Sequence, residues 1–396
     1  MTRDKVTYCK KCLVPSYSVN NMFDDEGVCN ACRVQEQFDE ITPDFWAIKE
    51  QKFLELAERA KIKSKHNYDC VVPVSGGKDS YFQVHKALEY GLKPLLVTYH
   101  GNNYLPEGQR NLDRMREKLG VDHVVFGPSI DTLKKLNKGC FEIMGDMNWH
   151  AHAGIKTYPM FLATRLKIPL VIWGEITWSI AGMFDPEDYV QYNKRTVYEH
   201  DMRGYTVDDM VKRIPGIAYK DLAWLTMPSD QELEESGTIG IYIGNYFKWD
   251  PNEHAYEMQK KYGFEFSEKP FERTYRRMSN LDDMHENGIH DYLKFIKFGY
   301  GRSTDHASKD IRSGYISREQ GIEYVRNMDH IKPNDLQRWL KYVDMTEDEF
   351  DTIADSFRDP RVWWIENGYW YKQNLWGVPS AYGKVKLKQE LWSKYL

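Results

Sequence analysis

Short apolar runs alternate with longer stretches of helical periodicity from residue 67 to about residue 175. The apolar runs predict strands at Asp69–Val74, Pro94–Tyr99, His123–Phe126 and Pro169–Trp173. The stretches between them predict helices at about Asp79–Tyr90, Glu107–Leu119, Asp131–Met144 and Gly154–Leu166. Short apolar strands separated by helices indicate an α/β fold, in which helices cover both faces of a parallel sheet.

The pattern changes on either side of this region. Residues 1–36 hold four cysteines among Asn, Asp and Gly, which predicts a small metal-binding module of the zinc-ribbon kind. Residues 37–66 are predicted to form a helical connector, because apolar residues recur there at helical spacing. The α/β domain is expected to span residues 67–245, and a mainly helical region residues 246–396. Helix starts are predicted there at Asp250-Pro251 and at the capping boxes Ser317–Gln320 and Thr346–Glu349.

Composition and charge narrow the class of protein. The 396 residues carry 54 Lys and Arg against 59 Asp and Glu, so the chain lacks the basic bias that nucleic-acid binding favours. It has neither an apolar run long enough for a membrane span nor an N-terminal signal-peptide core. We therefore expect a cytoplasmic enzyme that binds neither membrane nor nucleic acid. Aromatic residues make up 14% of the chain, which fits either a well-filled core or stacking platforms for sugar or base rings.

One loop carries the clearest chemical signal. Ser75-Gly76-Gly77-Lys78-Asp79-Ser80 joins the first predicted strand to the first predicted helix of the α/β region. Glycines let the backbone approach a ligand closely, and a helix N-terminus presents free N–H groups to an anion. The two serines add hydroxyls, Lys78 adds a cation, and Asp79 could bind the Mg²⁺ that accompanies a polyphosphate. The loop lacks both G-x-x-x-x-G-K-[ST] and G-x-G-x-x-G, yet we predict that it binds ATP phosphates rather than forming only a tight turn.

Two further strand ends are expected beside this loop, because ligands bind at the carboxyl edge of open parallel sheets. Thr98, Tyr99 and His100 end the second predicted strand and would lie beside the adenine and ribose of ATP. Gly174 and Glu175 follow the last predicted strand. Glu175 is a candidate contact for a second metal or an amine, and a solvated loop carboxylate is the alternative. Together with Lys78 and Asp79, it completes the set of catalytic candidates.

The four N-terminal cysteines have the spacing of a metal site. Cys9-x-x-Cys12 and Cys29-x-x-Cys32 are separated by 16 residues, within the range typical of a tetrahedral zinc site. Four protein ligands leave no open position, so we expect a structural role. An iron–sulfur cluster and disulfides are the alternatives. Cys70 and Cys140 are interpreted as small core residues rather than nucleophiles.

A second concentration of polar groups lies in the C-terminal region, in Phe298–Arg312. Arg302 and Arg312 could bind a phosphate or carboxylate bidentately, and Tyr300 is a further candidate substrate contact. Asp305, His306 and Asp310 could orient a substrate or act as a general base. A salt-bridged loop and helix surface is the alternative.

The Ser75–Ser80 loop resembles the S-G-G-x-D-S signature of the PP-loop (N-type) ATP pyrophosphatases, a HUP-like fold. The resemblance implies that ATP is cleaved between its α- and β-phosphates and that a substrate oxygen takes AMP. The paired cysteines, this loop, the Trp173-Gly174-Glu175 strand end and the Phe298–Arg312 stretch occur here in one order. As a set, from Cys9 to about residue 330, they resemble the N-acetyl sugar amidotransferases of surface-polysaccharide and nonulosonic-acid biosynthesis (lipopolysaccharide O-antigen among them).

This second resemblance implies a specific reaction and specific partners. An N-acetyl sugar would be adenylated on its acetamido oxygen, and ammonia would then displace AMP to give an acetamidino sugar. ATP, Mg²⁺ and Zn²⁺ are the implied cofactors. The ammonia would come from a separate glutaminase with a cyclase-like subunit related to imidazole glycerol phosphate synthase, in agreement with the lack of a glutaminase nucleophile motif here.

Two other functions fit parts of the sequence. A tRNA-modifying PP-loop enzyme, thiolating or lysidine-forming, would share the loop, and some such enzymes carry paired cysteines. The mild acidity and the absence of basic clusters count against it. A non-catalytic zinc-ribbon assembly protein that only senses ATP is the alternative of a different class.

Overall fold

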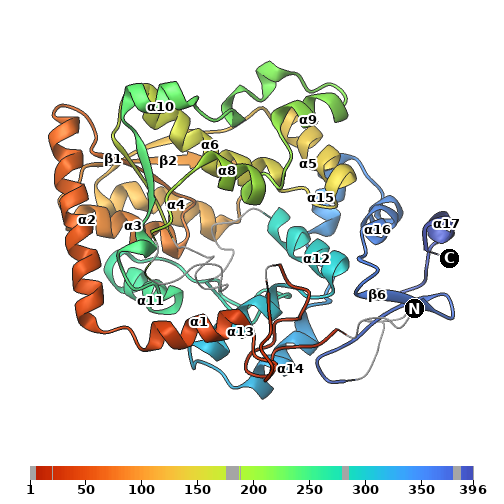
Figure 1. Ribbon diagram of the computed structural model, residues 1–396. Coiled ribbons are helices and arrows are strands. Elements are labelled where there is room, and N and C mark those ends of the chain that lie inside the picture. Colours follow the sequence, from red (N-terminus) through yellow and green to blue (C-terminus); the bar gives the residue numbers. More distant parts are fainter. Residues whose placement is uncertain are drawn as a thin grey trace.

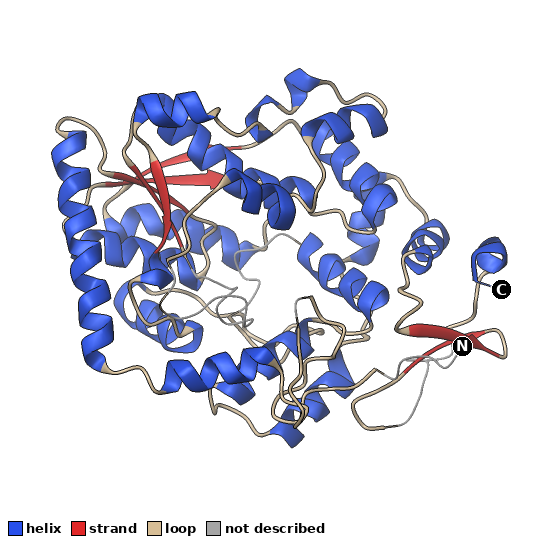
Figure 2. Ribbon diagram, viewed as in Figure 1, coloured by secondary structure: helices blue, strands red, loops and turns tan. Residues whose placement is uncertain are grey.

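The computed structural model describes residues 6–19, 21–174, 187, 189–278, 285–377 and 385–395 (Figure 1). A parallel sheet with strand order β3-β2-β1-β4-β5 forms the centre of the α/β region. Its strands are β1 Cys70–Pro73, β2 Pro94–Tyr99, β3 Asp122–Phe126, β4 Leu170–Trp173 and β5 Ile239–Tyr242. In Figure 2 they form one group surrounded by helices.

Helices make up most of the remaining structure. Those before and within the α/β region are α1 Asn30–Asp39, α2 Pro43–Ser64, α3 Lys78–Glu89, α4 Pro106–Leu119, α5 Ile130–Met144, α6 Trp149–Leu166, α8 Lys194–Thr196, α9 Val207–Arg213 and α10 Asp230–Ser236. Those after it are α11 Pro251–Tyr262, α12 Glu286–Phe298, α13 Arg302–Arg312, α14 Arg318–Met328, α15 Leu336–Val343, α16 Glu347–Ser356 and α17 Trp392–Tyr395.

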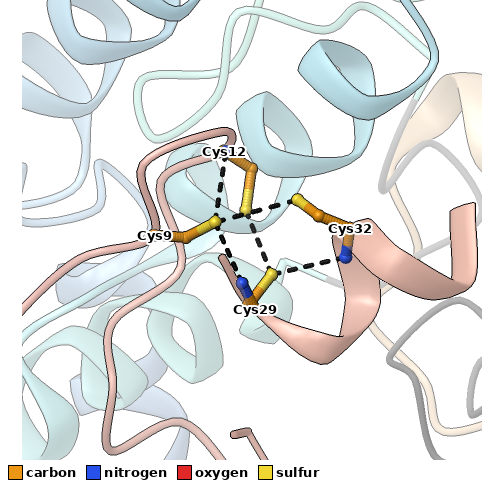
Figure 3. A group of neighbouring side chains, drawn as sticks. All are labelled: Cys9, Cys12, Cys29 and Cys32. Atoms are coloured by element: carbon orange, nitrogen blue, oxygen red, sulfur yellow. Dashed lines mark hydrogen bonds between the residues drawn. The ribbon is translucent and has the colours of Figure 1, made fainter. Parts of the chain in front are cut away.

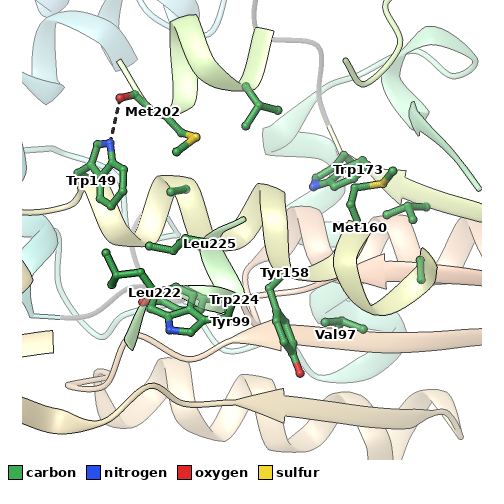
Figure 4. Close-up of a cluster of buried hydrophobic side chains, with 14 of the residues drawn as sticks. Val97, Tyr99, Trp149, Tyr158, Met160, Trp173, Met202, Leu222, Trp224 and Leu225 are labelled. Atoms are coloured by element: carbon green, nitrogen blue, oxygen red, sulfur yellow. Dashed lines mark hydrogen bonds between the residues drawn. The ribbon is translucent and has the colours of Figure 1, made fainter. Parts of the chain in front are cut away.

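The predicted α/β architecture is present, with helices on both faces of the sheet. Side chains alternate between the faces, since successive residues of a strand point to opposite sides. Val71 of β1 packs with α5 and α6, whereas Cys70 and Val72 pack with α2, α3 and α4. Figure 4 shows the core on the α6 side, where Trp149, Tyr158 and Met160 gather.

The prediction missed the fifth strand, and its sequence explains why. Ile239–Tyr242 contains Gly240, which lowers the strand signal. The glycine is required by packing, because a Cβ at this position would lie 2.6 Å from the Tyr192 Cβ and 2.7 Å from the Trp173 ring. A tertiary contact therefore sets this residue, and local pattern does not reveal it.

The C-terminal region is mainly helical, as predicted, and the three predicted helix starts are confirmed. Asp250 caps α11 with Pro251 as its first residue, and Ser317 and Thr346 form capping boxes. The region also contains an antiparallel hairpin that was not predicted, formed by β6 Trp363–Glu366 and β7 Tyr369–Lys372. Both turn residues, Asn367 and Gly368, have positive φ, as a two-residue hairpin turn requires.

The cysteine module docks on this C-terminal region, far away in the sequence. Leu13 is fully buried between α13 and α14, where it packs with Ala307 and Val325. A Cβ at Gly321 of α14 would lie 2.9 Å from a Leu13 methyl group, so the glycine leaves room for the leucine. Because Leu13 follows the second cysteine directly, this contact places the whole module against α13.

Candidate functional site

The loop Ser75–Ser80 leaves β1 and enters α3 in a conformation that requires glycine. Gly76 has φ +95°, and a Cβ there would lie 2.9 Å from Leu112 N and 3.0 Å from Leu112 Cα on α4. Gly77 is the N-cap of α3 and offers no side-chain acceptor to its first N–H groups. The Ser80 hydroxyl accepts from Ser75 N at 3.0 Å and lies 3.3 Å from the Ser75 hydroxyl. The loop therefore presents backbone donors and hydroxyls at the positive end of a helix.

Asp79 is the most informative side chain of the loop. Its Oδ2 accepts from Lys78 Nζ at 2.7 Å. Its Oδ1 is buried, and none of the described residues donates a hydrogen bond to it. A buried carboxylate oxygen without a donor is costly, and a hard cation such as Mg²⁺ would satisfy it. The residues present therefore fit a magnesium polyphosphate, with Lys78 as the accompanying cation.

The end of β2 is hydrogen-bonded to the residue that precedes the loop. Thr98 is buried, and its hydroxyl donates to Val74 O at 2.6 Å and lies 2.8 Å from His123 Nε2. The Tyr99 ring points into the core on the α6 side, where it stacks on Trp224 at 4.8 Å (Figure 4). His100 is half-buried and stacks on Tyr104. Contacts of these three residues with adenine or ribose stay predictions.

The end of β4 lies against α3 and the segment before α11. A Cβ at Gly174 would lie 3.0 Å from the Gln83 amide and 3.3 Å from the Trp249 ring. Gly174 O accepts from Gly244 N at 3.2 Å. Sequence reasoning missed Gln83 and Trp249, since neither belongs to a local motif. Glu175 lies outside the described residues.

The polar stretch Phe298–Arg312 forms the helix α13, whose start is fixed by a distant carboxylate. Asp329 is buried and accepts from Gly301 N at 2.9 Å and Thr304 N at 3.1 Å. This carboxylate caps the helix N-terminus in place of a local side chain. Nothing in the sequence around Gly301 identifies it.

Most of the candidate residues on α13 take part in ion pairs. Arg302 Nε donates to Asp291 at 2.8 Å, and Arg273 Nε donates to the other oxygen of the same carboxylate at 2.8 Å. Burial alone would raise the pKa of Asp291, but the two guanidinium groups lower it to about 2. Asp310 pairs with Arg276, and Asp305 with Lys294.

Tyr300, the remaining aromatic candidate, is buried at the cysteine module. Its hydroxyl lies 3.1 Å from that of Ser18, and Lys294 Nζ lies 4.4 Å from the ring centroid. The ion pairs of α13 agree in part with the alternative interpretation, in which Phe298–Arg312 is a salt-bridged loop and helix. They leave the roles of Tyr300 and the α13 residues in substrate binding as predictions.

His306 is a buried residue of α13 that contacts the segment before α12. Its Nδ1 lies 2.6 Å from the Thr274 hydroxyl, and the residue is buried. Burial, together with the charges of nearby cations that include Lys78, lowers the pKa of His306 well below its usual range. Burial and Lys78 also contribute to lowering the pKa of His254, which stacks on Phe82 of α3. Helix α11 therefore packs against α3, the helix that follows the loop, through the His254–Phe82 contact.

The four cysteines form the cluster predicted from their spacing (Figure 3). Their sulfurs lie within 4.8 Å of one another, with 3.8 Å between Cys9 and Cys32 and 3.6 Å between Cys12 and Cys29. A tetrahedral ion with Zn–S bonds of about 2.3 Å has S···S edges of about 3.8 Å. Backbone N–H groups of Cys12 and Cys29 point at the Cys9 sulfur, at 3.4 and 3.3 Å. The geometry fits a structural metal such as zinc.

The cluster also has a neighbouring cation. Arg312 Nη1 lies 3.7 Å from the Cys12 sulfur. Hydrogen bonds from Cys29 and Cys32 lower the pKa of the Cys12 thiol to about 6, and the Arg312 guanidinium acts in the same direction. Cys70 and Cys140, by contrast, are fully buried, and burial raises the pKa of both thiols. Neither has the depressed pKa of a reactive thiolate.

Comparison with known proteins gives a family match for part of the chain. A family model described as LPS biosynthesis protein WbpG-like, C-terminal domain, matches residues 245–375. No curated protein matches the chain. Among solved structures, an NMN synthetase from Francisella tularensis has 13% sequence identity and a TM-score of 0.28, over 58% of this chain and 99% of that chain. Within the described part of the chain, no helix combines the length and apolar character needed to cross a membrane.

Proposed function

We propose that this protein is an ATP-dependent amidotransferase that converts the acetamido group of an N-acetyl sugar into an acetamidino group, in lipopolysaccharide or related surface-polysaccharide biosynthesis. The observation that carries the proposal is the buried, unsatisfied Asp79 Oδ1 in a glycine-bent loop at the N-terminus of α3. Such an arrangement suits the pyrophosphate of ATP with its Mg²⁺. The family match over residues 245–375 supports the pathway, because α13 lies within that span.

The loop residues have distinct tasks in this reaction. Backbone N–H groups of Gly77 and the first turn of α3 would hold the β- and γ-phosphates, with the two serine hydroxyls beside them. Lys78 would balance the charge that grows on departing pyrophosphate. Asp79 would hold Mg²⁺, which neutralises the polyphosphate and polarises the phosphorus–oxygen bond when bound.

The chemistry proceeds in two displacements. The acetamido oxygen attacks the α-phosphorus, an oxygen–phosphorus bond forms, and pyrophosphate leaves with the electron pair of the broken bond. The amide nitrogen loses its proton to solvent, and the product is an O-adenylyl imidate, which is activated at carbon. Ammonia then adds to that carbon, AMP leaves, and the nitrogen sheds a proton to give the amidine. We propose that the ammonia comes from a separate glutaminase with a cyclase-like subunit.

The test is pyrophosphate release from ATP and Mg²⁺ in the presence of ammonium, with a panel of acetamido sugars compared against bulk tRNA. The expected result is sugar-dependent release, with a product lighter by the difference between O and NH in mass spectrometry. Release that depends on tRNA would overturn the sugar assignment and favour a tRNA-modifying enzyme. Absence of release with either would overturn the proposed chemistry.

A matched pair of variants tests the role of Asp79. Asp79→Asn removes the charge of the proposed magnesium ligand, so pyrophosphate release should fall by about 100-fold or more. Asp131→Asn is the control, because Asp131 also lies in the first turn of a helix but on α5. Equal activity of the two variants would contradict the assignment.

A further inference from the structure

A pocket lies between α1 and the start of α2 on one side and the segment 244–252 and α13 on the other. Its aromatic lining comes from Phe38, Trp46 and Trp249. Gly244 also lines it, and Gly244 N donates to Gly174 O at the end of β4, so the pocket adjoins the edge of the sheet that carries the phosphate loop. The pocket therefore lies where a second substrate could meet ATP.

The charges of this pocket favour an anion. Lys248, Lys309 and Arg312 line it, and no carboxylate of the described residues lies within ion-pair distance of them. Three acidic residues also line the pocket, and one of them, Asp39, accepts a hydrogen bond from Gln35 Nε2 at 2.9 Å. Asp310 is neutralised by Arg276, and Asp250 accepts from the first N–H groups of α11. A phosphate or a carboxylate would find cations here without first displacing an ion pair.

Arg312 belongs both to the pocket and to the cysteine cluster. Its Nη1 lies 3.7 Å from the Cys12 sulfur, while its Nε is buried and has no acceptor among the described residues. A guanidinium has donors on more than one edge, so it can contact a thiolate and an oxyanion at the same time. Buried donors are rarely left without an acceptor, so the Nε is available to donate to a ligand in the pocket.

Helix α1, which forms the opposite wall of the pocket, also begins at the cysteine cluster. The Cys29 sulfur caps α1, accepting from Cys32 N at 3.4 Å, and the same helix carries Phe38 into the pocket. Leu13 fixes the module between α13 and α14, as described above. Both walls are therefore joined to the four cysteines through short covalent or buried connections.

We propose that the metal-loaded cysteine module is a working part of this pocket, which binds the phosphate or carboxylate of the substrate through an Arg312 held in place by the cluster. Four thiolates around a divalent ion keep a net negative charge, which attracts the guanidinium and fixes its direction. A side chain fixed in advance loses less entropy when the ligand binds. The proposal rests on the proposed function only in taking the ligand to be the sugar substrate.

The test is equilibrium binding to the full chain, with Mg²⁺ and a non-hydrolysable ATP analogue filling the loop. Two probes are titrated by calorimetry: N-acetylglucosamine 1-phosphate and N-acetylglucosaminuronic acid. Arg312→Ala should weaken binding of the preferred probe by about 10–100-fold, as loss of a charged hydrogen bond predicts. Arg312→Lys should recover only part of the loss, since an ammonium group cannot span both contacts.

Arg318→Ala is the matched control. Arg318 Nη2 donates to Cys9 O at 3.3 Å, so this arginine also holds the module, but it does not line the pocket. Its replacement should leave the affinity for the probes within about twofold of wild type, because Arg318 lies outside the pocket and charges screened by solvent contribute little to binding. All three variants should retain their metal. An equal loss in Arg318→Ala and Arg312→Ala would overturn the specific role of Arg312.

Metal release gives a second readout that needs no turnover. Coupling between two sites is reciprocal, so the bound probe must raise the affinity for zinc, and a competing chelator must remove less zinc at equilibrium from the wild type but not from Arg312→Ala. Failure of both probes to bind, or zinc release that ignores a bound probe, would overturn the proposal. Preference for one probe identifies the anion. Normal binding without pyrophosphate release would instead refute the proposed function and leave the pocket intact.

Discussion

Replacement of Gly76 by alanine tests how closely the phosphate loop is matched to its surroundings. The residue has φ +95°, a region that L-amino acids other than glycine rarely adopt. An added Cβ would lie 2.9 Å from Leu112 N and 3.0 Å from Leu112 Cα. Both are backbone atoms of α4, so no side chain can rotate away. Either the loop or the helix must move.

The expected magnitude follows from two separate costs. A non-glycine residue at such a φ costs about 1–3 kcal/mol, and forcing extra volume into a packed site costs about 1–3 kcal/mol more. Gly76→Ala should therefore lower the free energy of unfolding by about 2–6 kcal/mol. A loop displaced by a fraction of an ångström misaligns its N–H groups, so pyrophosphate release should fall by about 100-fold.

The assay is urea unfolding together with pyrophosphate release, with Gly120→Ala as the control. Gly120 ends α4 with φ +66°, and nothing lies within 4 Å of an added Cβ. It therefore reports the cost of positive φ alone, about 1–2 kcal/mol, without the clash. If both variants unfold at the same urea concentration and keep their activity, the close approach to α4 has no functional weight.

Two further predictions concern the metal site and a buried acid. Cys29→Ser should lose the bound metal, measured by atomic emission. It should also unfold residues 6–39 locally, because both a metal ligand and the cap of α1 change. Cys140→Ala lies outside the cluster and should keep the metal, so an unchanged metal content in both variants would contradict the four-cysteine site. Burial raises the pKa of Glu286 from 4.5 to about 7, so the folded chain keeps a proton that the unfolded chain releases in this interval. The free energy of unfolding should therefore fall as pH rises from about 4.5 to about 7, by on the order of 3 kcal/mol from this group, and urea titrations of Glu286→Gln should lack that slope.

Local sequence signals were sufficient for four of the five strands of the sheet and for the helices between those four strands. Each of the four predicted strands begins and ends within one residue of its expected position, and β2 matches its expected position at both ends. These strands are visible in the sequence because buried parallel strands are continuous apolar runs. The hairpin around Asn367-Gly368 could also have been predicted, since Asn-Gly between aromatic residues is the strongest short hairpin signal. Helix periodicity in the surrounding region concealed it. The division of the chain at residues 36, 66 and 245 stays a prediction.

Some parts of the candidate site depend on residues that are close together in the sequence, and other parts depend on residues that are far apart. The turn from β1 into α3 at Ser75–Ser80 and the grouping of the four cysteines could be predicted, because their residues lie close together in the sequence at fixed spacing. The partners of α13 could not. Asp291 and Asp329 hold Arg302 and the start of α13 across turns of the chain that no local pattern encodes. Tyr99 shows the converse, because its strand-end position gave no indication that its ring faces the α6 core.

These distant carboxylates also help to fix α13 beside the cysteine module. Asp329 fixes the first turn of α13, whose next residues lie within the electrostatic reach of Lys78. Arg312, at the last turn of the same helix, reaches the Cys12 sulfur. The eleven-residue helix, about 16 Å long, therefore joins this capped first turn to the cysteine cluster.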